Sequence, residues 1–215
     1  MNTPLVKICG LTREEDVKSA VSLGADAIGF VFAQSPRRVT PEAAARLAVH
    51  VPPGVLRIGL FLDQDQADIE GVMASVPLDV LQFHGREREE QCSAFGLPWL
   101  KALSMADGAA LRRAEQDYPG AMGWLLDSHQ AGQRGGSGEV FDWSLVHVVD
   151  KPIWLAGGLH ANNVGEAIHT VRPYAVDVSS GVESAPGIKD AAKVSAFIEA
   201  VRETVSNFAG NRSYD

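Results

Sequence analysis

Two short apolar runs of this sequence each end in a residue that can exchange a proton. Cys9 ends the run LVKIC (5–9), and Asp127 ends the run GWLLD (123–127). A cysteine thiolate removes protons, and a partly desolvated carboxyl group holds a proton near neutral pH and can donate it. The pair therefore predicts general base and general acid chemistry, provided that the fold brings the two side chains to one site.

Both residues also have a purely structural interpretation. Cys9 is consistent with a small buried hydrophobic residue, and Asp127 with a cap of the next segment or an ion-pair partner of an arginine. Side chains alternate along an extended run, so Lys7 and Cys9 share one face of LVKIC while Ile8 lies on the other. We expect the Lys7 ammonium to lower the pKa of Cys9 and to lie within reach of a bound ligand.

Glycine and serine follow two later apolar runs, in LAGGL (155–159) and DVSSGVE (177–183). Glycine lets backbone N–H groups approach an anion, and serine hydroxyl groups add donors. These segments predict a phosphate site made by Gly157, Gly158, Ser179, Ser180 and Gly181. Each segment taken alone is also ordinary turn material.

Three further features could complete a ligand site. Arg37, in SPRR, has the forked donors that bind a planar carboxylate, and His84, at the end of VLQFH, could donate to a ligand. The glycine-rich segment 128–142 after Asp127 is typical of a loop that closes over a substrate. The alternatives are a solvated surface arginine, a histidine satisfied by its neighbours, and a slack surface loop.

Eight runs rich in β-branched or aromatic residues predict the strands that must position these side chains. They are LVKIC (5–9), AIGFVF (27–32), LRIGLFL (56–62), VLQFH (80–84), WLKALS (99–104), GWLLD (123–127), IWLAG (153–157) and AVDVSS (175–180). Spacings of roughly 20 to 30 residues leave room for the crossovers that parallel strands need. We expect strand and helix to alternate eight times in an α/β fold, a single (β/α)8 TIM barrel with eight parallel strands and the site at their C-terminal ends. A doubly wound open sheet is the alternative.

Helix start signals support this alternation. Thr12 precedes two glutamates, Thr40-Pro41 is typical of an N-cap followed by a first-turn proline, and Asp107 and Asn162 begin later segments. Residues 1–215 are expected to form one domain, with a polar tail at 207–215 that frays.

Composition limits the function classes. The 215 residues contain 46% hydrophobic and 21% charged residues, with a formal net charge of -8 and scattered basic residues, which argues against nucleic acid or an anionic membrane as partner. No signal peptide or long apolar span is seen, so we expect a soluble cytoplasmic protein without an obligate protein partner. Two cysteines without CxxC spacing, and six histidines without an HxxxH pattern, predict neither a disulfide framework nor a metal site.

The motifs taken in series resemble those of the phosphoribosylanthranilate isomerase family. They are KICGLT, GADAIGFVF, SPR before TPE, QFHG, LLD followed by GGSG and FDW, LAGGL with Asn162-Asn163-Val164, and RPYAVDVSSGVE followed by PGIKD. The resemblance runs from Lys7 to about Asp190, nearly the whole chain, and KICG together with DVSSGVE and PGIKD is highly specific.

The resemblance implies a TIM barrel that catalyses an Amadori rearrangement of a phosphorylated aminosugar without metal or organic cofactor. It assigns the catalytic cysteine to Cys9, the catalytic aspartate to Asp127 and the carboxylate-binding arginine to Arg37. It also assigns phosphate binding to the loops at 157–158 and 179–181. Arg38 stands where the family usually has an aromatic residue, which offers a second arginine for the carboxylate.

Two other functions are alternatives to this one. Another phosphate-binding barrel, such as an indole-glycerol-phosphate synthase or a metal-using sugar-phosphate epimerase, would need its own lysine and glutamate set or His and Asp ligands at the strand ends. Neither pattern is seen. A catalytically idle barrel that only binds a phosphorylated ligand is not favoured, because Cys9 and Asp127 are both present.

Overall fold

Eight parallel strands close into a barrel in the computed structural model, which describes residues 3–106, 108–128 and 140–210. The strands are β1 (Leu5–Cys9), β2 (Ala27–Val31), β3 (Leu56–Phe61), β4 (Val80–Phe83), β5 (Trp99–Ser104), β6 (Gly123–Asp127), β7 (Ile153–Leu155) and β8 (Ala175–Val178). Each pairs with the next, and β1 also pairs with β8, with Leu5 opposite Ala175. This closure confirms the predicted barrel and excludes the open sheet.

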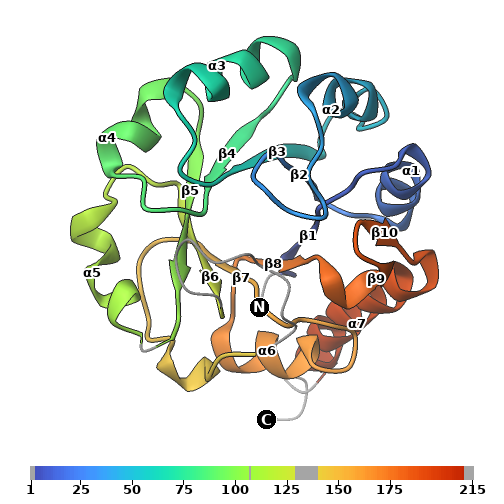
Figure 1. The fold of residues 1–215 in the computed structure, drawn as a ribbon. Helices are drawn as coiled ribbons and strands as arrows, with labels where there is room; N and C mark the ends of the chain where they lie inside the picture. Colours follow the sequence, from blue (N-terminus) through green and yellow to red (C-terminus); the bar gives the residue numbers. More distant parts are fainter. Residues whose placement is uncertain (1–2, 107, 129–139, 211–215) are drawn as a thin grey trace.

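A ring of helices surrounds the strands (Figure 1). The helices are α1 (Glu14–Leu23), α2 (Pro41–Ala48), α3 (Gln66–Ser75), α4 (Glu89–Cys92), α5 (Ala109–Asp117), α6 (Val164–Val171) and α7 (Ala191–Gly210). Three short 3₁₀ helices accompany them, η1 (Ser93–Phe95), η2 (Trp143–Leu145) and η3 (Ser180–Val182). A small antiparallel hairpin of β9 (Glu183–Ala185) and β10 (Ile188–Lys189), which the sequence analysis did not predict, lies between β8 and α7.

The alternation of strand and helix differs from the prediction in one connection. In the described part of the segment between β6 and β7, the helical element is η2 and not an α-helix. Glycine is a poor helix former because it loses the most backbone freedom on ordering, and residues 128–138 contain four glycines. The greater part of the predicted loop 128–142, residues 129–139, lies outside the described residues.

Helix starts follow the predicted signals in part. Thr40 is the N-cap of α2, its side chain accepts a hydrogen bond from the Ala43 N–H at 3.2 Å, and Pro41 is the first helical residue. Thr12 does not cap α1, because its hydroxyl group donates to the carbonyl of Gly187 at 2.6 Å. The N-cap of α6 is Asn163, one residue after the predicted Asn162, and Asp107 lies outside the described residues. The predicted tail overlaps the last turn of α7 at 207–210, and residues 211–215 lie outside the described part.

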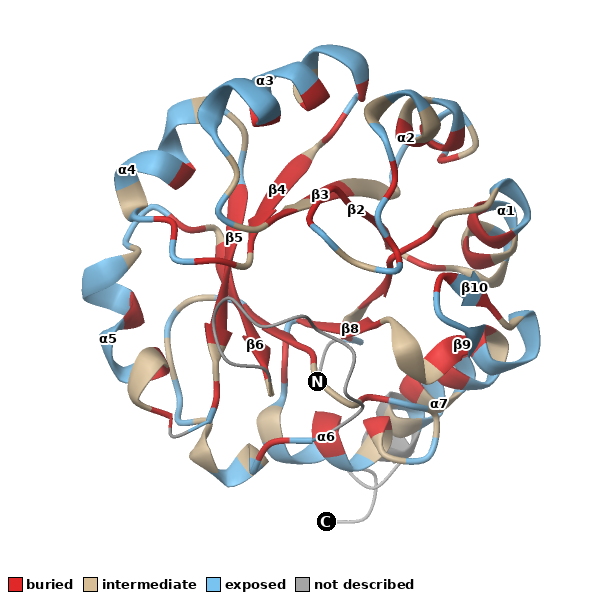
Figure 2. Ribbon diagram, in the orientation of Figure 1, coloured by how far each residue is buried: buried red, intermediate tan, exposed pale blue. Residues whose placement is uncertain are grey.

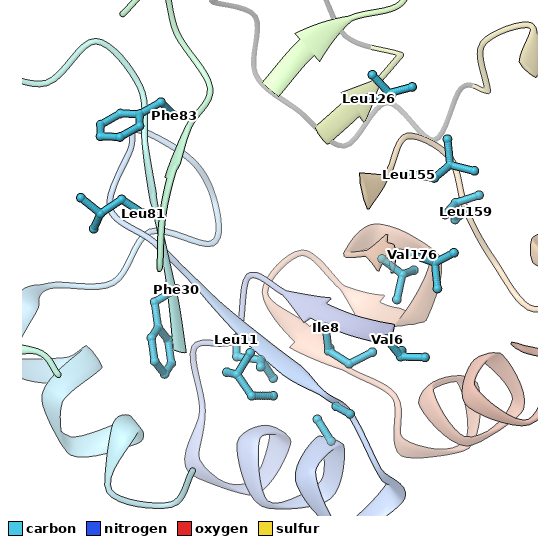
Figure 3. Close-up of a cluster of buried hydrophobic side chains, with 14 of the residues drawn as sticks. Val6, Ile8, Leu11, Phe30, Leu81, Phe83, Leu126, Leu155, Leu159 and Val176 are labelled. Atoms are coloured by element: carbon cyan, nitrogen blue, oxygen red, sulfur yellow. The ribbon is translucent and has the colours of Figure 1, made fainter. Parts of the chain in front are cut away.

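Apolar side chains pack in two layers. One layer fills the space between strands and helices, and Ile8 belongs to it, as its place on the strand face predicted (Figure 3). The other layer fills the barrel interior and includes Ile58, Leu125 and Trp154. Buried residues accordingly form the strands and the inner helix faces, while the outer helix faces are exposed (Figure 2). Among the described residues, no helix is long and apolar enough to span a membrane.

Candidate active site

A cavity of about 830 Å³, including its open mouth, lies at the C-terminal ends of the barrel strands. This is the end where parallel barrels collect side chains from several strands into one site. Nine residues predicted from the sequence lie in its wall: Cys9, Arg37, His84, Asp127, Gly157, Gly158, Ser179, Ser180 and Gly181. The fold therefore brings together residues that are up to 172 positions apart, Cys9 and Gly181.

Cys9 lies at the end of β1 and is only 5% exposed. The adjacent strand approaches it closely, because a Cβ atom built on Gly29 would lie 2.7 Å from the Cys9 sulfur. Any larger residue at position 29 of β2 would displace the Cys9 sulfur from the cavity wall.

The Lys7 ammonium acts on the pKa of Cys9 in the predicted direction, which is downward, but it does not decide the net shift. Burial raises the pKa of Cys9, and this outweighs the opposing attraction of the Lys7 ammonium. The ammonium is itself compensated, since Nζ of Lys7 lies 2.7 Å from Oδ2 of Asp177. The net pKa of Cys9 is therefore above its usual value, and the thiol form dominates in the free protein.

Lys7 itself is fully buried, and it does not belong to the described residues of the cavity wall. Its Nζ donates to Oδ2 of Asp177 and to Oε1 of Gln82, the latter at 2.9 Å. Burial disfavours its charge, but Asp177 and Cys9 reverse that effect, so the pKa of Lys7 is raised. Lys7 therefore contacts the cavity through two side chains that do lie in its wall, Gln82 and Asp177.

Asp127 ends β6 and is 8% exposed. Nε2 of His84 lies 3.3 Å from its Oδ2, and the Ser128 hydroxyl group donates to its Oδ1 at 3.4 Å. The other ring nitrogen of His84, Nδ1, lies 3.0 Å from Nε2 of Gln82. His84 therefore fits both interpretations from the sequence. Its ring nitrogens are satisfied by neighbouring side chains, and it also lies in the cavity wall.

Arg37 is not a solvated surface residue, since it is 8% exposed and its Nε and Nη2 donate to the two carboxylate oxygens of Glu183 at 2.8 and 2.7 Å. This fork-to-fork pairing fixes the plane of the guanidinium group. The hydrogen bond to Glu183 raises the pKa of Arg37. Arg38 is exposed, and only Arg37 of the two belongs to the described wall.

The loops that follow β7 and β8 touch each other. A Cβ atom built on Gly181 would lie 1.9 Å from the backbone oxygen of Leu159, so no other residue fits there without movement of the backbone. Gly157 and Gly158 have φ values of 82° and 64°, in the region that favours glycine. Together these loops line one part of the cavity with backbone and serine groups.

Four polar residues of the site were not found from the sequence: Gln82, Asp177, Glu183 and Lys189. The signal for the first two was present, since each is a polar residue within an otherwise apolar strand. Oδ1 of Asp177 is buried without a hydrogen-bond partner among the described residues, in the wall of the cavity. Nζ of Lys189 contacts Oε1 of Glu183 at 2.8 Å and the backbone oxygen of Ser179 at 3.1 Å, which ties the hairpin to the β8 loop.

Comparison with known protein families gives one match over most of the chain. The family model for N-(5'-phosphoribosyl)anthranilate (PRA) isomerase matches residues 6–200. An N-(5'-phosphoribosyl)anthranilate isomerase of Pseudomonas putida (strain GB-1) is 53% identical over 199 residues, which cover 92% of this chain and 97% of the relative. The enzyme of that name from Chromohalobacter salexigens is 52% identical over 206 residues, which cover 95% and 97%.

Solved structures give the same result. Phosphoribosyl anthranilate isomerase from Thermotoga maritima superposes with a TM-score of 0.84 and 40% identity, over 93% of this chain and 99% of that one. A phosphoribosyl anthranilate isomerase in complex with reduced 1-(o-carboxyphenylamino)-1-deoxyribulose 5-phosphate superposes with a TM-score of 0.81 and 38% identity, over 93% and 99%. The likeness thus extends over nearly the full length of each pair.

Proposed function

Because this chain belongs to the N-(5'-phosphoribosyl)anthranilate isomerase family, we propose that Cys9 and Asp127 are the base and the acid of its reaction. The enzyme catalyses the Amadori rearrangement of N-(5-phosphoribosyl)anthranilate to 1-(2-carboxyphenylamino)-1-deoxyribulose 5-phosphate, a step of tryptophan biosynthesis. The observation that carries the proposal is that both side chains lie in the wall of one cavity with the glycine and serine loops of β7 and β8.

Each of the two groups transfers one proton. Asp127, in its protonated form, gives its proton to the furanose ring oxygen while the anilino nitrogen forms a double bond to C1′ and the bond from C1′ to the ring oxygen breaks. Cys9, as thiolate, then removes the proton from C2′, and the resulting enolamine tautomerises to the ketone. A well-placed acid or base of this kind contributes about 100-fold to 10,000-fold in rate.

The raised pKa of Cys9 agrees with this order of events. Burial keeps the sulfur protonated in the free protein. Ring opening produces a cationic iminium group next to C2′, which makes the C2′ proton more acidic and favours a thiolate nearby. Deprotonation of Cys9 is therefore tied to the presence of the opened substrate, and the thiol proton passes to solvent at the open mouth of the cavity before the thiolate takes the proton from C2′.

Two anchors hold the substrate between these groups. The phosphate binds at Gly157, Gly158 and the loop 179–181, where backbone N–H groups and hydroxyl groups can surround an anion. The anthranilate carboxylate binds at Arg37 through Nη1, since Glu183 occupies Nε and Nη2. Anchors at the two ends orient the sugar between base and acid, which is where positioning contributes most to rate.

His84 and Lys7 have the remaining substrate-binding roles. His84 lies beside Asp127 in the wall and contacts the sugar from the β4 side. Lys7 acts on the substrate through Asp177, whose unpartnered Oδ1 accepts a hydrogen bond from a sugar hydroxyl group.

A charged phosphate ester does not cross membranes freely, which supports a cytoplasmic location for the enzyme.

The test compares Cys9→Ala and Asp127→Asn with wild type, following loss of anthranilate fluorescence from freshly made substrate. We expect kcat to fall by about 100-fold to 10,000-fold in each, because each removes one proton-transfer group. Matched controls are Cys92→Ala, a buried cysteine of α4 outside the described wall, and Asp68→Asn, on the exposed surface of α3. A folded Cys9→Ala or Asp127→Asn protein with wild-type kcat would overturn that residue's assignment.

A further inference from the structure

A row of hydrogen bonds crosses the mouth of the barrel from β1 through β4 to β6. Nζ of Lys7 lies 2.9 Å from Oε1 of Gln82, and Nε2 of Gln82 lies 3.0 Å from Nδ1 of His84. Nε2 of His84 lies 3.3 Å from Oδ2 of Asp127. Gln82 is fully buried and stands in the middle of this row.

The direction of each hydrogen bond follows from the chemistry of its members. An ammonium group only donates, so Lys7 must face the amide oxygen of Gln82, and the amide NH₂ group must face His84. The NH₂ group cannot accept, so Nδ1 of His84 is the acceptor and carries no proton. A neutral His84 therefore has its proton on Nε2, which donates to Oδ2 of Asp127.

We propose that Gln82 is a positioning residue that fixes His84 as the Nε2–H tautomer and thereby places the transferable proton of Asp127 on Oδ1. Oδ2 accepts from His84 and cannot at the same time hold a proton directed at Nε2. Oδ1 lies on the side of Gly157, since a Cβ atom on that glycine would be 3.0 Å from it. The Ser128 hydroxyl group, which donates to the ionised Oδ1 at 3.4 Å, can rotate and accept when Oδ1 carries the proton. This inference deepens the proposed function and rests on the acid role of Asp127.

The other tautomer would interfere with the acid. With the proton on Nδ1, the lone pair of Nε2 would face Oδ2, where it would either repel the carboxylate or accept the proton intended for the substrate. Lys7 sets the orientation of Gln82 at the far end of the row, and its raised pKa agrees with a permanently charged donor. Nζ of Lys7 donates one hydrogen bond to Oδ2 of Asp177 and a separate one to the amide oxygen of Gln82.

The direct test reads the protonation of each ring nitrogen of His84 by long-range ¹H–¹⁵N NMR of the full chain labelled at histidine. The His84 signals are assigned from their loss in His84→Asn. Wild type is expected to show a protonated Nε2 and an unprotonated Nδ1. In Gln82→Glu an acceptor replaces the donor, Lys7 keeps its partner, and Nδ1 is expected to gain a proton. The matched control is Gln66→Glu, on the exposed surface of α3, where the His84 pattern should not change.

The kinetic test asks whether Gln82 acts through His84. Gln82→Met is expected to lower kcat about tenfold, the effect of one lost hydrogen bond to the histidine that holds the acid, with a much smaller change in KM. In the His84→Asn background the same change should cost no further rate, because coupled residues are not additive. A merely structural role would give the same loss in both backgrounds.

The outcomes separate this inference from the proposed function. A wild-type His84 with its proton on Nδ1, an unchanged pattern in Gln82→Glu, or additive losses in the double variant would overturn the role of Gln82 while leaving Cys9 and Asp127 in place. Full activity of Asp127→Asn would instead overturn the acid assignment, and with it the catalytic purpose of the tautomer. The nitrogen spectrum needs only folded protein, so it decides the tautomer even where a variant has low activity.

Discussion

At the scale of single residues, burial has more influence on ionisation at the barrel mouth than the nearest charge. Cys9 has an ammonium two residues away on the same strand face, yet burial raises its pKa. Burial is the largest cause, and Asp177 adds to it because it compensates the charge of Lys7 and opposes a thiolate directly. The acidity of the sulfur is therefore a property of its burial together with Lys7, Asp177 and Lys189, and not of the KIC motif alone.

Removing the carboxylate should make Cys9 more acidic. In Asp177→Asn the Lys7 charge loses its compensation and a direct repulsion of the thiolate disappears, so we predict a lower pKa for Cys9. Because alkylation requires the thiolate, iodoacetamide should modify Cys9 faster at a given pH below that pKa, and the pH profile of the rate should shift to lower pH. Mass spectrometry of the alkylated peptides over a pH series measures this.

Cys92 is an internal reference in the same experiment, because burial raises its pKa to about 12 and it should react slowly in both proteins. Asp68→Asn on α3 controls for the loss of one negative charge. Breaking a buried ion pair also lowers the free energy of unfolding, by about 3–5 kcal/mol, so folding is checked first. An unchanged or higher pKa of Cys9 in folded Asp177→Asn would contradict the interpretation.

At the scale of elements, the loops after β7 and β8 work as one unit with the β9–β10 hairpin. Gly181 packs against the backbone of Leu159, and Lys189 of the hairpin binds the backbone oxygen of Ser179. The hairpin also supplies Glu183, which fixes Arg37. One short segment after β8 therefore supports both proposed anchors, for the phosphate and for the carboxylate.

Gly181→Ala is predicted to raise KM at least tenfold with a smaller effect on kcat. An added Cβ atom would lie 1.9 Å from a backbone oxygen, so the two loops must separate and the phosphate site loses its geometry. Steady-state kinetics with N-(5-phosphoribosyl)anthranilate measure both constants. Gly71→Ala is the matched control, since nothing lies within 4 Å of its added Cβ atom and alanine favours a helix over glycine by about 1 kcal/mol. A wild-type KM in folded Gly181→Ala would remove these loops from substrate binding.

At the scale of the whole molecule, packing and chemistry occupy different levels of the barrel. The inner apolar layer includes Trp154, which is fully buried and whose ring contacts Tyr174, the residue before β8, at a centroid distance of 6.1 Å. Tyr174 marks the N-terminal end of the strands, opposite the cavity. The reaction at the cavity therefore does not depend on every side chain of the inner apolar layer.

Trp154→Ala should lower stability without changing the chemistry. Loss of a fully buried aromatic side chain costs about 3–5 kcal/mol in the free energy of unfolding, which urea denaturation measures. The indole N–H has no hydrogen-bond partner among the described residues, so the loss is one of packing. We expect kcat to stay within about twofold of wild type under conditions where the variant is folded. A large fall in kcat together with unchanged stability would show that the layers are not separate.

The sequence by itself determined the barrel and most of the positions at its mouth. The bounds of β1, β5 and β6 agree with the predicted runs because alternation and composition are local properties, whereas β7 and β8 end two residues earlier, before Gly157 and Ser179. Cys9 and Asp127 could be placed near each other because the ends of parallel barrel strands converge whatever lies between them.

Only the tertiary structure decided how these groups are held and charged. The pairing of Arg37 with Glu183 joins residues 146 positions apart, and the contact of Lys7 with Asp177 joins residues 170 apart. Burial, compensation of charge and the direction of a hydrogen bond depend on such neighbours, which no local pattern specifies. The raised pKa of Cys9 and the orientation of Gln82 therefore became visible only once the strands had closed into a ring.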